Sequence, residues 1–277
     1  MNVSETVIAN SRVDRHGESI SADALRELAS SVADVYIPIN IEHDPRHPPV
    51  GRLHSAYVRE ANDGEFEVVG TLEVFEGDIP EMCESERELR LPRVDSDKIQ
   101  IQYDRNYKNP RDEALLRELS SATEAHLGYV GKKSLDPLSV ICISAGTFAL
   151  GGIAKGFFSK LGGESYELLK IKLKELFSQN KDGEKEKLLE FEFSVQHGEY
   201  SFNVSVIVTN PRGEDIDALL DKHLERLDEN VIDVFDQRVG LKKLVYQVHE
   251  GEITLSFGVR RDCVPLMPRP ADLKPGT

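Results

Sequence analysis

Hydrophobic and polar positions alternate through much of the first hundred residues, as in short β-strands, and one stretch has a helical period. The alternation predicts strands at residues 6–9, 36–41, 53–58, 66–75 and 98–103. A helix is predicted over residues 21–32, with Ser21 as its N-cap. Asn-Asp-Gly at residues 62–64 predicts a hairpin turn. We therefore expect a β-rich N-terminal domain over residues 1–107.

The next pattern is a run of 18 residues without a charge, residues 137–154. It predicts an apolar helix inside a central helical region, residues 108–180. One interpretation is a helix or helix hairpin buried in a globular domain, and the other is a membrane span, for which the run has the minimum length. Gly152 and Gly156 form a GxxxG pair, which lets two helices approach closely. The lysines of the following amphipathic helix, 164–177, fit either an anionic membrane surface or an ordinary solvated face.

In the third region, residues 181–267, the pattern predicts two strands, one long helix and two further strands. The order ββαββ is typical of a compact α+β unit that binds, senses or dimerises. Residues 268–277 are rich in proline and predict a flexible tail. The whole chain is therefore expected to have an α+β fold, with a β-rich front, a central helical segment and a C-terminal ββαββ domain.

Composition limits the classes of partner and compartment. The net charge of −15 argues against nonspecific binding to nucleic acid, because phosphates would be repelled. The three cysteines, Cys83, Cys142 and Cys263, form no CxxC pair and suit a reducing compartment. The N-terminal residues have no basic segment followed by an apolar core, so no secretory signal is predicted. We expect a cytoplasmic protein, or one at the cytoplasmic face of a membrane.

His43 is the main candidate for chemistry. It follows the predicted strand 36–41 and precedes a turn stiffened by prolines, and an imidazole held in this way is suited to act as a base near neutral pH. The alternative is a turn in which His43 and Asp44 hydrogen-bond the backbone. His43, Asp44 and His47 could also suggest metal ligands, but the neighbouring prolines disfavour the helix that would align them. We expect no metal site and no cofactor.

Four short motifs carry a resemblance to a known family. Asn-Ser-Arg-Val-Asp-Arg-His-Gly-Glu at residues 10–18, the strand ending in His43, Pro-Val-Gly-Arg at 49–52 and Asp-Gly-Glu-Phe at 63–66 are similar to the prohead (capsid maturation) serine proteases of tailed phages. The likeness covers residues 7–103. It implies a β-barrel-like core, shared with herpesvirus assemblins, with His43 as general base and a nucleophilic serine on a later strand.

The chain departs from that family at the nucleophile. The strand in question reads Ile-Gln-Ile-Gln-Tyr, with Gln100 in the position of the serine and Gln102 in the position of the glycine. An amide cannot be activated for acyl transfer. Ser96 is the nearest alternative, and it would be catalytic only if the domain is active. We therefore expect a protease-like domain that has lost its nucleophile.

Three functions remain open from the sequence. The favoured one is a non-catalytic interaction or regulatory protein that binds a protein or peptide partner, with a modular architecture analogous to proteins of phage–host conflict and antiviral defence. The second is an active serine endopeptidase with His43 as base and Ser96 as nucleophile. The third is a membrane-associated effector that contacts lipid through residues 137–154. Homo-oligomerisation is compatible with each of them.

Overall fold

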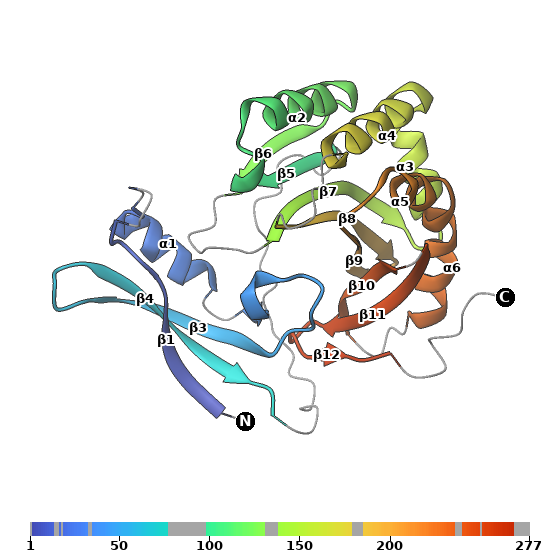
Figure 1. Cartoon of the computed structure of the whole chain (residues 1–277). Coiled ribbons are helices and arrows are strands. Elements are labelled where there is room, and N and C mark those ends of the chain that lie inside the picture. Colours follow the sequence, from blue (N-terminus) through green and yellow to red (C-terminus); the bar gives the residue numbers. More distant parts are fainter. Residues whose placement is uncertain are drawn as a thin grey trace. The chain divides into compact units, whose positions relative to one another are not determined.

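The structure is a computed structural model that describes residues 2–13, 17, 19–32, 35–76, 98–130, 138–178, 185–235, 240–249 and 251–268 (Figure 1). The chain forms two compact units. The first comprises residues 1–93 and 259–266, and the second comprises residues 94–258 and 267–277. Both helices and sheets are present, so the predicted α+β class is confirmed.

The first unit contains a four-stranded antiparallel sheet. Its strands are β1 (Asn2–Asn10), β2 (Ile37–Ile39), β3 (Gly51–Glu60) and β4 (Phe66–Val74). The order is β1-β4-β3-β2, so β1 and β2 are the two edges in the part of the chain that the structure describes. The predicted hairpin is confirmed, because β3 and β4 are antiparallel neighbours on either side of residues 62–64.

One helix, α1 (Ala22–Val32), covers one face of this sheet. Ser21 caps it as predicted, since its hydroxyl accepts a hydrogen bond from the amide of Ala24 at 3.2 Å. Leu25 and Val32, one at each end of the helix, are both buried, in two apolar clusters against β3 and β4. The apolar positions that recur with a helical period in residues 21–32 therefore form the face of α1 that packs against the sheet.

The second sheet has eight strands. They are β5 (Gln100–Asp104), β6 (His126–Val130), β7 (Leu138–Ala149), β8 (Glu186–His197), β9 (Tyr200–Thr209), β10 (Leu241–His249), β11 (Glu252–Arg260) and β12 (Pro265–Leu266). Their order is β12-β11-β10-β9-β8-β7-β5-β6. The last residues of β11 and all of β12 fall in the segment 259–266 that belongs to the first unit.

Three parallel strand pairs with helical connections build most of this sheet. After the short helix η2 (Arg105–Tyr107), α2 (Pro110–Ala122) joins β5 to β6, and α3 (Ile153–Leu161) with α4 (Gly163–Phe177) joins β7 to β8. The third connection, from β9 to β10, consists of α5 (Gly213–Ala218), a π-helical turn η3 (Leu219–His223) and α6 (Leu224–Val234). Where one pair meets the next, β5 with β7 and β8 with β9, the strands are antiparallel. Figure 1 shows the helices of this unit gathered along one side of its sheet.

The helix-covered face of the second sheet is apolar. Phe157 of α3 packs edge-on against Phe191 and Phe193 of β8, with ring centroids 6.0 and 5.7 Å apart. Ile143 and Val206 lie in register with Phe191 and are fully buried. Burial of aromatic and β-branched side chains is the main stabilising term for this unit.

The opposite face of the same strands is polar. Glu190 accepts hydrogen bonds from the hydroxyl of Ser205 at 2.5 Å and the ammonium of Lys243 at 3.2 Å. Glu192 accepts one from the amide of Asn203 at 2.7 Å. Burial by itself lowers the pKa of Lys243, but the two carboxylates more than offset it and raise that pKa, so the ammonium stays charged. A hydrogen-bonded ionic row thus replaces a second apolar core on this face.

The predicted helix at residues 137–154 is wrong. Residues 138–149 form strand β7, and helix α3 begins only at Ile153. The run carries no charge because β7 is a central strand, paired with β5 on one side and β8 on the other, and its residues Ile141 and Ile143 face the apolar core. In the described part of the chain, no helix is long and apolar enough to cross a membrane.

Of the GxxxG pair, Gly156 allows α3 to pack closely against an aromatic ring of β7. A methyl group on Gly156 would come within 2.4 Å of a ring carbon of Phe148, so α3 can approach β7 only with glycine here. The start of α3 is fixed by Asp228 of α6, whose carboxylate accepts hydrogen bonds from the amides of Ile153 and Ala154 at 2.8 and 3.2 Å.

The lysines of α4 are engaged in ion pairs. Lys170 contacts Asp221 at 2.8 Å, and Lys174 contacts Asp217 at 2.6 Å. Lys172 contacts Glu118 of α2 at 2.6 Å. This arrangement favours the solvated-face interpretation over an anionic membrane surface, because each ammonium already has an acidic neighbour.

The C-terminal order ββαββ is confirmed, with β8 and β9 before the helical connection and β10 and β11 after it. These strands continue the sheet that contains β7 and β5. The boundaries expected at residues 107 and 180 therefore do not coincide with the observed boundary, and β5 lies in the second unit.

Candidate functional site

The two predicted catalytic residues are only partly within the described structure. His43 is the last residue of a short 3-10 turn, η1 (Ile41–His43), which is separated from β2 by Asn40 alone. The side chain of His43 and the whole of Ser96 lie outside the described residues. Their roles as base and nucleophile therefore stay predictions.

The strand expected to carry the nucleophile belongs to another sheet. Gln100 and Gln102 lie on β5, in register with Ser144 and Cys142 of β7 in the second unit. The resemblance placed this strand in the N-terminal barrel, and that placement is wrong. The alternation of residues 98–103 was interpreted correctly as a strand, but it contains no information about which sheet the strand joins.

The turn after His43 is built around Asp44. Its buried carboxylate accepts hydrogen bonds from the backbone amide of Arg46 at 2.9 Å and from the Arg46 guanidinium at 2.7 Å. Burial alone raises the pKa of Asp44, but the bonds from Arg46 outweigh it and hold this pKa below its ordinary value. Asp44 therefore stabilises the turn by hydrogen-bonding the backbone, which is the alternative to a role in catalysis. Within the described residues, no group of three or more histidine, cysteine or acidic side chains could hold a metal ion.

Another feature of the first unit is the outer edge of its sheet. Strand β1 pairs with β4 along its whole length, from Asn2 opposite Val74 to Asn10 opposite Glu67. In the described part of the chain its other side has no strand partner. We call residues 3–8 of this strand the β1 edge.

Apolar side chains are exposed along the β1 edge. Val3 is 61% exposed, Val7 is 40% exposed and Ile8 is 38% exposed. The register shifts between Val7 and Ala9, so Ile8 forms a bulge in the pairing with β4. Natural sheets usually protect such an edge with charges, and this one carries a single charged residue, Glu5.

Glu5 is held over the sheet by a hydrogen bond to β3. The hydroxyl of Tyr57 donates to its carboxylate at 3.2 Å, across the intervening strand β4. The one acidic side chain of the edge is therefore engaged on the sheet face, and the neighbouring Val7 stays accessible.

An ion network fixes the end of β1 to the hairpin of β3 and β4. Arg12 contacts Asp63 at 2.9 Å and Glu67 at 2.8 Å, and Arg59 contacts the same Glu67 at 2.8 Å. Hydrogen bonds from Arg12 lower the pKa values of Asp63 and Glu67. Both carboxylates remain ionised at neutral pH, and the network keeps the strand in register.

A second, buried ion network lies at the other end of β3 and β4. The guanidinium of Arg52 donates to the Glu73 carboxylate at 2.7 Å and to the backbone oxygen of Asp262 at 3.1 Å. It also lies 4.3 Å from the ring centroid of Tyr36. The contact between Arg52 and Asp262 ties the returning segment 259–266 to β3, and within that segment Arg260 pairs with the Asp262 carboxylate at 2.5 Å.

The residue types of β1 also indicate a strand, independently of the hydrophobic period. Val3, Thr6, Val7 and Ile8 are β-branched, which favours a strand. Strand order cannot be derived from this pattern, so the strand was predicted and its edge position was not.

Comparisons with protein-family models, with curated proteins and with solved structures found no match.

Proposed function

We propose that this chain is a non-catalytic interaction protein whose first unit binds an extended segment of a partner polypeptide along the β1 edge. One observation carries the proposal. A nine-residue strand at the border of the sheet has exposed β-branched side chains, and its single acidic group is turned over the sheet.

The physical basis is strand addition. A strand at the border of a sheet presents unpaired amide and carbonyl groups, and a partner segment gains affinity by hydrogen-bonding to them. Val3 and Val7 supply apolar contacts for alternate side chains of that segment. The net charge of −15 favours a partner segment that is uncharged or basic.

The resemblance to prohead proteases is consistent with recognition in place of cleavage. The resemblance aligns Gln100 with the family's nucleophile, and an amide side chain cannot form an acyl-enzyme. In addition, β5, which carries Gln100, belongs to the sheet of the second unit. We therefore expect no labelling of any serine by a fluorophosphonate probe. Labelling that disappears when His43 or Ser96 is replaced would contradict the non-catalytic proposal.

The edge itself can be tested by peptide selection on the full chain. Random peptides are displayed and selected for binding, and the best are synthesised for fluorescence anisotropy. The double variant Val3→Lys/Val7→Lys should weaken their binding about tenfold or more, because it removes apolar contacts worth a few kcal/mol. Val13→Lys is the matched control, since Val13 is 69% exposed and lies beyond β1.

Three outcomes decide the proposal. Extended peptides that lose affinity in the double variant and keep it in the control would support it. Peptides that bind both variants equally would overturn it. So would a β1 edge that is occupied by a second copy of the chain in solution, which sedimentation of the free protein would detect.

A further inference from the structure

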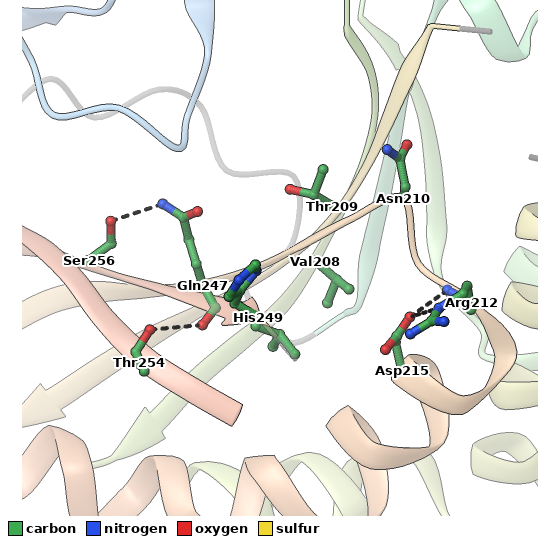
Figure 2. Close-up of a pocket in the computed structure, with 10 residues that line it drawn as sticks. Val208, Thr209, Asn210, Arg212, Asp215, Gln247, His249, Thr254 and Ser256 are labelled. Carbon is green, nitrogen blue, oxygen red and sulfur yellow. Dashed lines mark hydrogen bonds and ion pairs between the residues drawn. The ribbon is translucent and has the colours of Figure 1, made fainter. Parts of the chain in front are cut away.

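A pocket of about 430 Å³ lies in the second unit, at the ends of the parallel strands β9 and β10 (Figure 2). Ligands of sheets with parallel strands commonly bind beyond the carboxyl ends of those strands. The volume is in the range of small-molecule sites. Nothing in the proposed role of the β1 edge uses this pocket.

Hydroxyl and amide groups line one wall of the pocket. Gln247 of β10 donates its side-chain amide to the hydroxyl of Ser256 at 2.9 Å. Its main-chain oxygen accepts from the hydroxyl of Thr254 at 3.5 Å. His249, at the end of β10, lines the same pocket (Figure 2). These bonds organise the wall, and each hydroxyl can still accept or donate a further bond.

The opposite wall comes from the end of β9 and the start of α5. Thr209 and Asn210 add a hydroxyl and an amide. Arg212 and Asp215 form an ion pair at 3.2 Å, and the backbone amide of Arg212 donates to the same carboxylate at 2.9 Å. Figure 2 shows this pair across the pocket from Gln247.

The charges of the pocket cancel. Arg212 is neutralised by Asp215 and also contacts Glu214 at 2.9 Å, so its guanidinium is not a free anion receptor. The lysine, arginine and acidic residues of the lining are Arg212 and Asp215, and their charges are opposite. An anionic or cationic ligand would therefore lose hydration without gaining a counter-charge.

The pocket lining contains three hydroxyls, two side-chain amides and an imidazole, which can both donate and accept hydrogen bonds. The hydroxyl groups of a ligand need this combination, because each one donates one bond and accepts others. Val208 and Val248 add a small aliphatic surface for C–H groups. Apart from the imidazole, the lining has no aromatic ring, so it does not fit a stacked base.

We propose that this pocket binds an uncharged polyhydroxyl ligand of the saccharide or polyol class. The proposal rests on the pocket and its lining alone and is independent of the β1 edge. The ligand would bridge the hydroxyl and amide wall of β10 and β11 and the loop that joins β9 to α5.

Titration calorimetry of the full chain tests this inference directly. The probes are glucose, maltose and sorbitol, with glucose 6-phosphate and ADP as anionic counterparts. We expect saturable binding of at least one neutral probe and weaker or no binding of the anions. Saturation is the necessary criterion, because excluded sugars stabilise any folded protein without occupying a site.

A matched pair of variants locates the site. Thr254→Val/Ser256→Ala removes two hydroxyls from the pocket and should weaken binding about tenfold, as expected for the loss of two hydrogen bonds. Ser201→Ala, on an exposed residue at the other end of β9, should bind as the unmodified chain does. If the double variant fails to fold, Thr254→Val alone is used, since that side chain is exposed.

Three results would overturn the inference. The first is the lack of saturable binding with every neutral probe. The second is binding that is unchanged when the pocket hydroxyls are removed, and the third is stronger binding of the anionic probes.

Discussion

The two sheets leave different parts of their backbone and side chains available. In the first unit, α1 covers one face, ion networks fix both ends of β3 and β4, and the long strand β1 forms an exposed edge. In the second unit, helices cover an apolar face, and the opposite face carries hydrogen-bonded ionic side chains. This difference is the basis of the two proposals, which assign partner binding to a backbone edge in the first unit and ligand binding to a side-chain pocket in the second.

The edges of the two sheets support the same distinction. In the second sheet the edge strand β6 has five residues, and Tyr129 on it is contacted by the ring of Tyr103 and by the ammonium of Lys108. A short edge strand is a usual protection against strand pairing. The nine residues of β1 lack this protection, so β1 is the edge that fits a partner.

The largest effect is expected in the buried ion network of the first unit. Arg52→Ala removes the guanidinium that pairs with the buried Glu73, while Asp262 keeps Arg260, and breaking a buried pair in this way costs about 3–5 kcal/mol. Hydrogen exchange of β4 amides measures the loss. The exposed pair of Arg26 and Asp23 is the control, and Arg26→Ala should cost at most about 0.5 kcal/mol. Equal losses would show that burial does not distinguish these pairs.

The packing of α3 on β7 gives the next effect in the second unit. Gly156→Ala forces the new methyl group against Phe148, and overpacking of this kind costs about 1–3 kcal/mol. Gly163→Ala is the control, because nothing lies within 4 Å of its added methyl group and alanine favours a helix. Urea unfolding followed by circular dichroism compares the two variants. A Gly156→Ala variant as stable as the control would contradict the close approach.

A smaller effect is expected where α6 caps α3. Asp228→Ala removes the acceptor for the amides of Ile153 and Ala154 and should cost about 0.5–2 kcal/mol. Asp228→Asn keeps one side-chain oxygen and should lose less. The same urea titration measures both. If the two substitutions are equivalent, the carboxylate does not act as the cap.

The smallest effect concerns pH and His223, which lies in the π-helical turn. Its ring is buried, and burial lowers its pKa below the ordinary value of 6.5. The unfolded chain therefore takes up the proton first, so stability is complete above pH 6.5 and declines as pH falls below it. Beside the ring, Glu252 raises this pKa and Arg226 and Lys222 lower it.

A titration of stability from pH 8 to pH 5 checks this expectation. His223→Gln should flatten the decline below pH 6.5, because glutamine does not titrate. His249→Gln, on an exposed histidine, is the control and should leave the decline in place. A decline that is unchanged in His223→Gln would contradict the assignment.

Local patterns in the sequence predicted most elements of residues 1–107. The helix at 21–32, the hairpin around 62–64 and the strand at 98–103 depend on spacing and turn chemistry within a few residues. The sheet to which β5 belongs depends on pairing with β7, which is about forty residues away. No local pattern contains that information.

The error at residues 137–154 has a physical origin. The prediction of an apolar helix rests on the absence of charge, but a central strand buried between two neighbours also excludes charges. The alternation of Ile141, Cys142, Ile143 and Ser144 was the better signal, because it separates the apolar and polar faces of β7. Neither the β1 edge nor the strand-end pocket could be predicted, since both follow from strand order.

The central claim is that the first unit recognises an extended segment at the β1 edge. Amide hydrogen exchange of the full chain, with and without a selected peptide, tests it most directly. The account predicts slower exchange confined to residues 3–8, with β2 at the opposite edge unchanged. Unchanged exchange at residues 3–8, or protection only in the turn that follows His43, would contradict it.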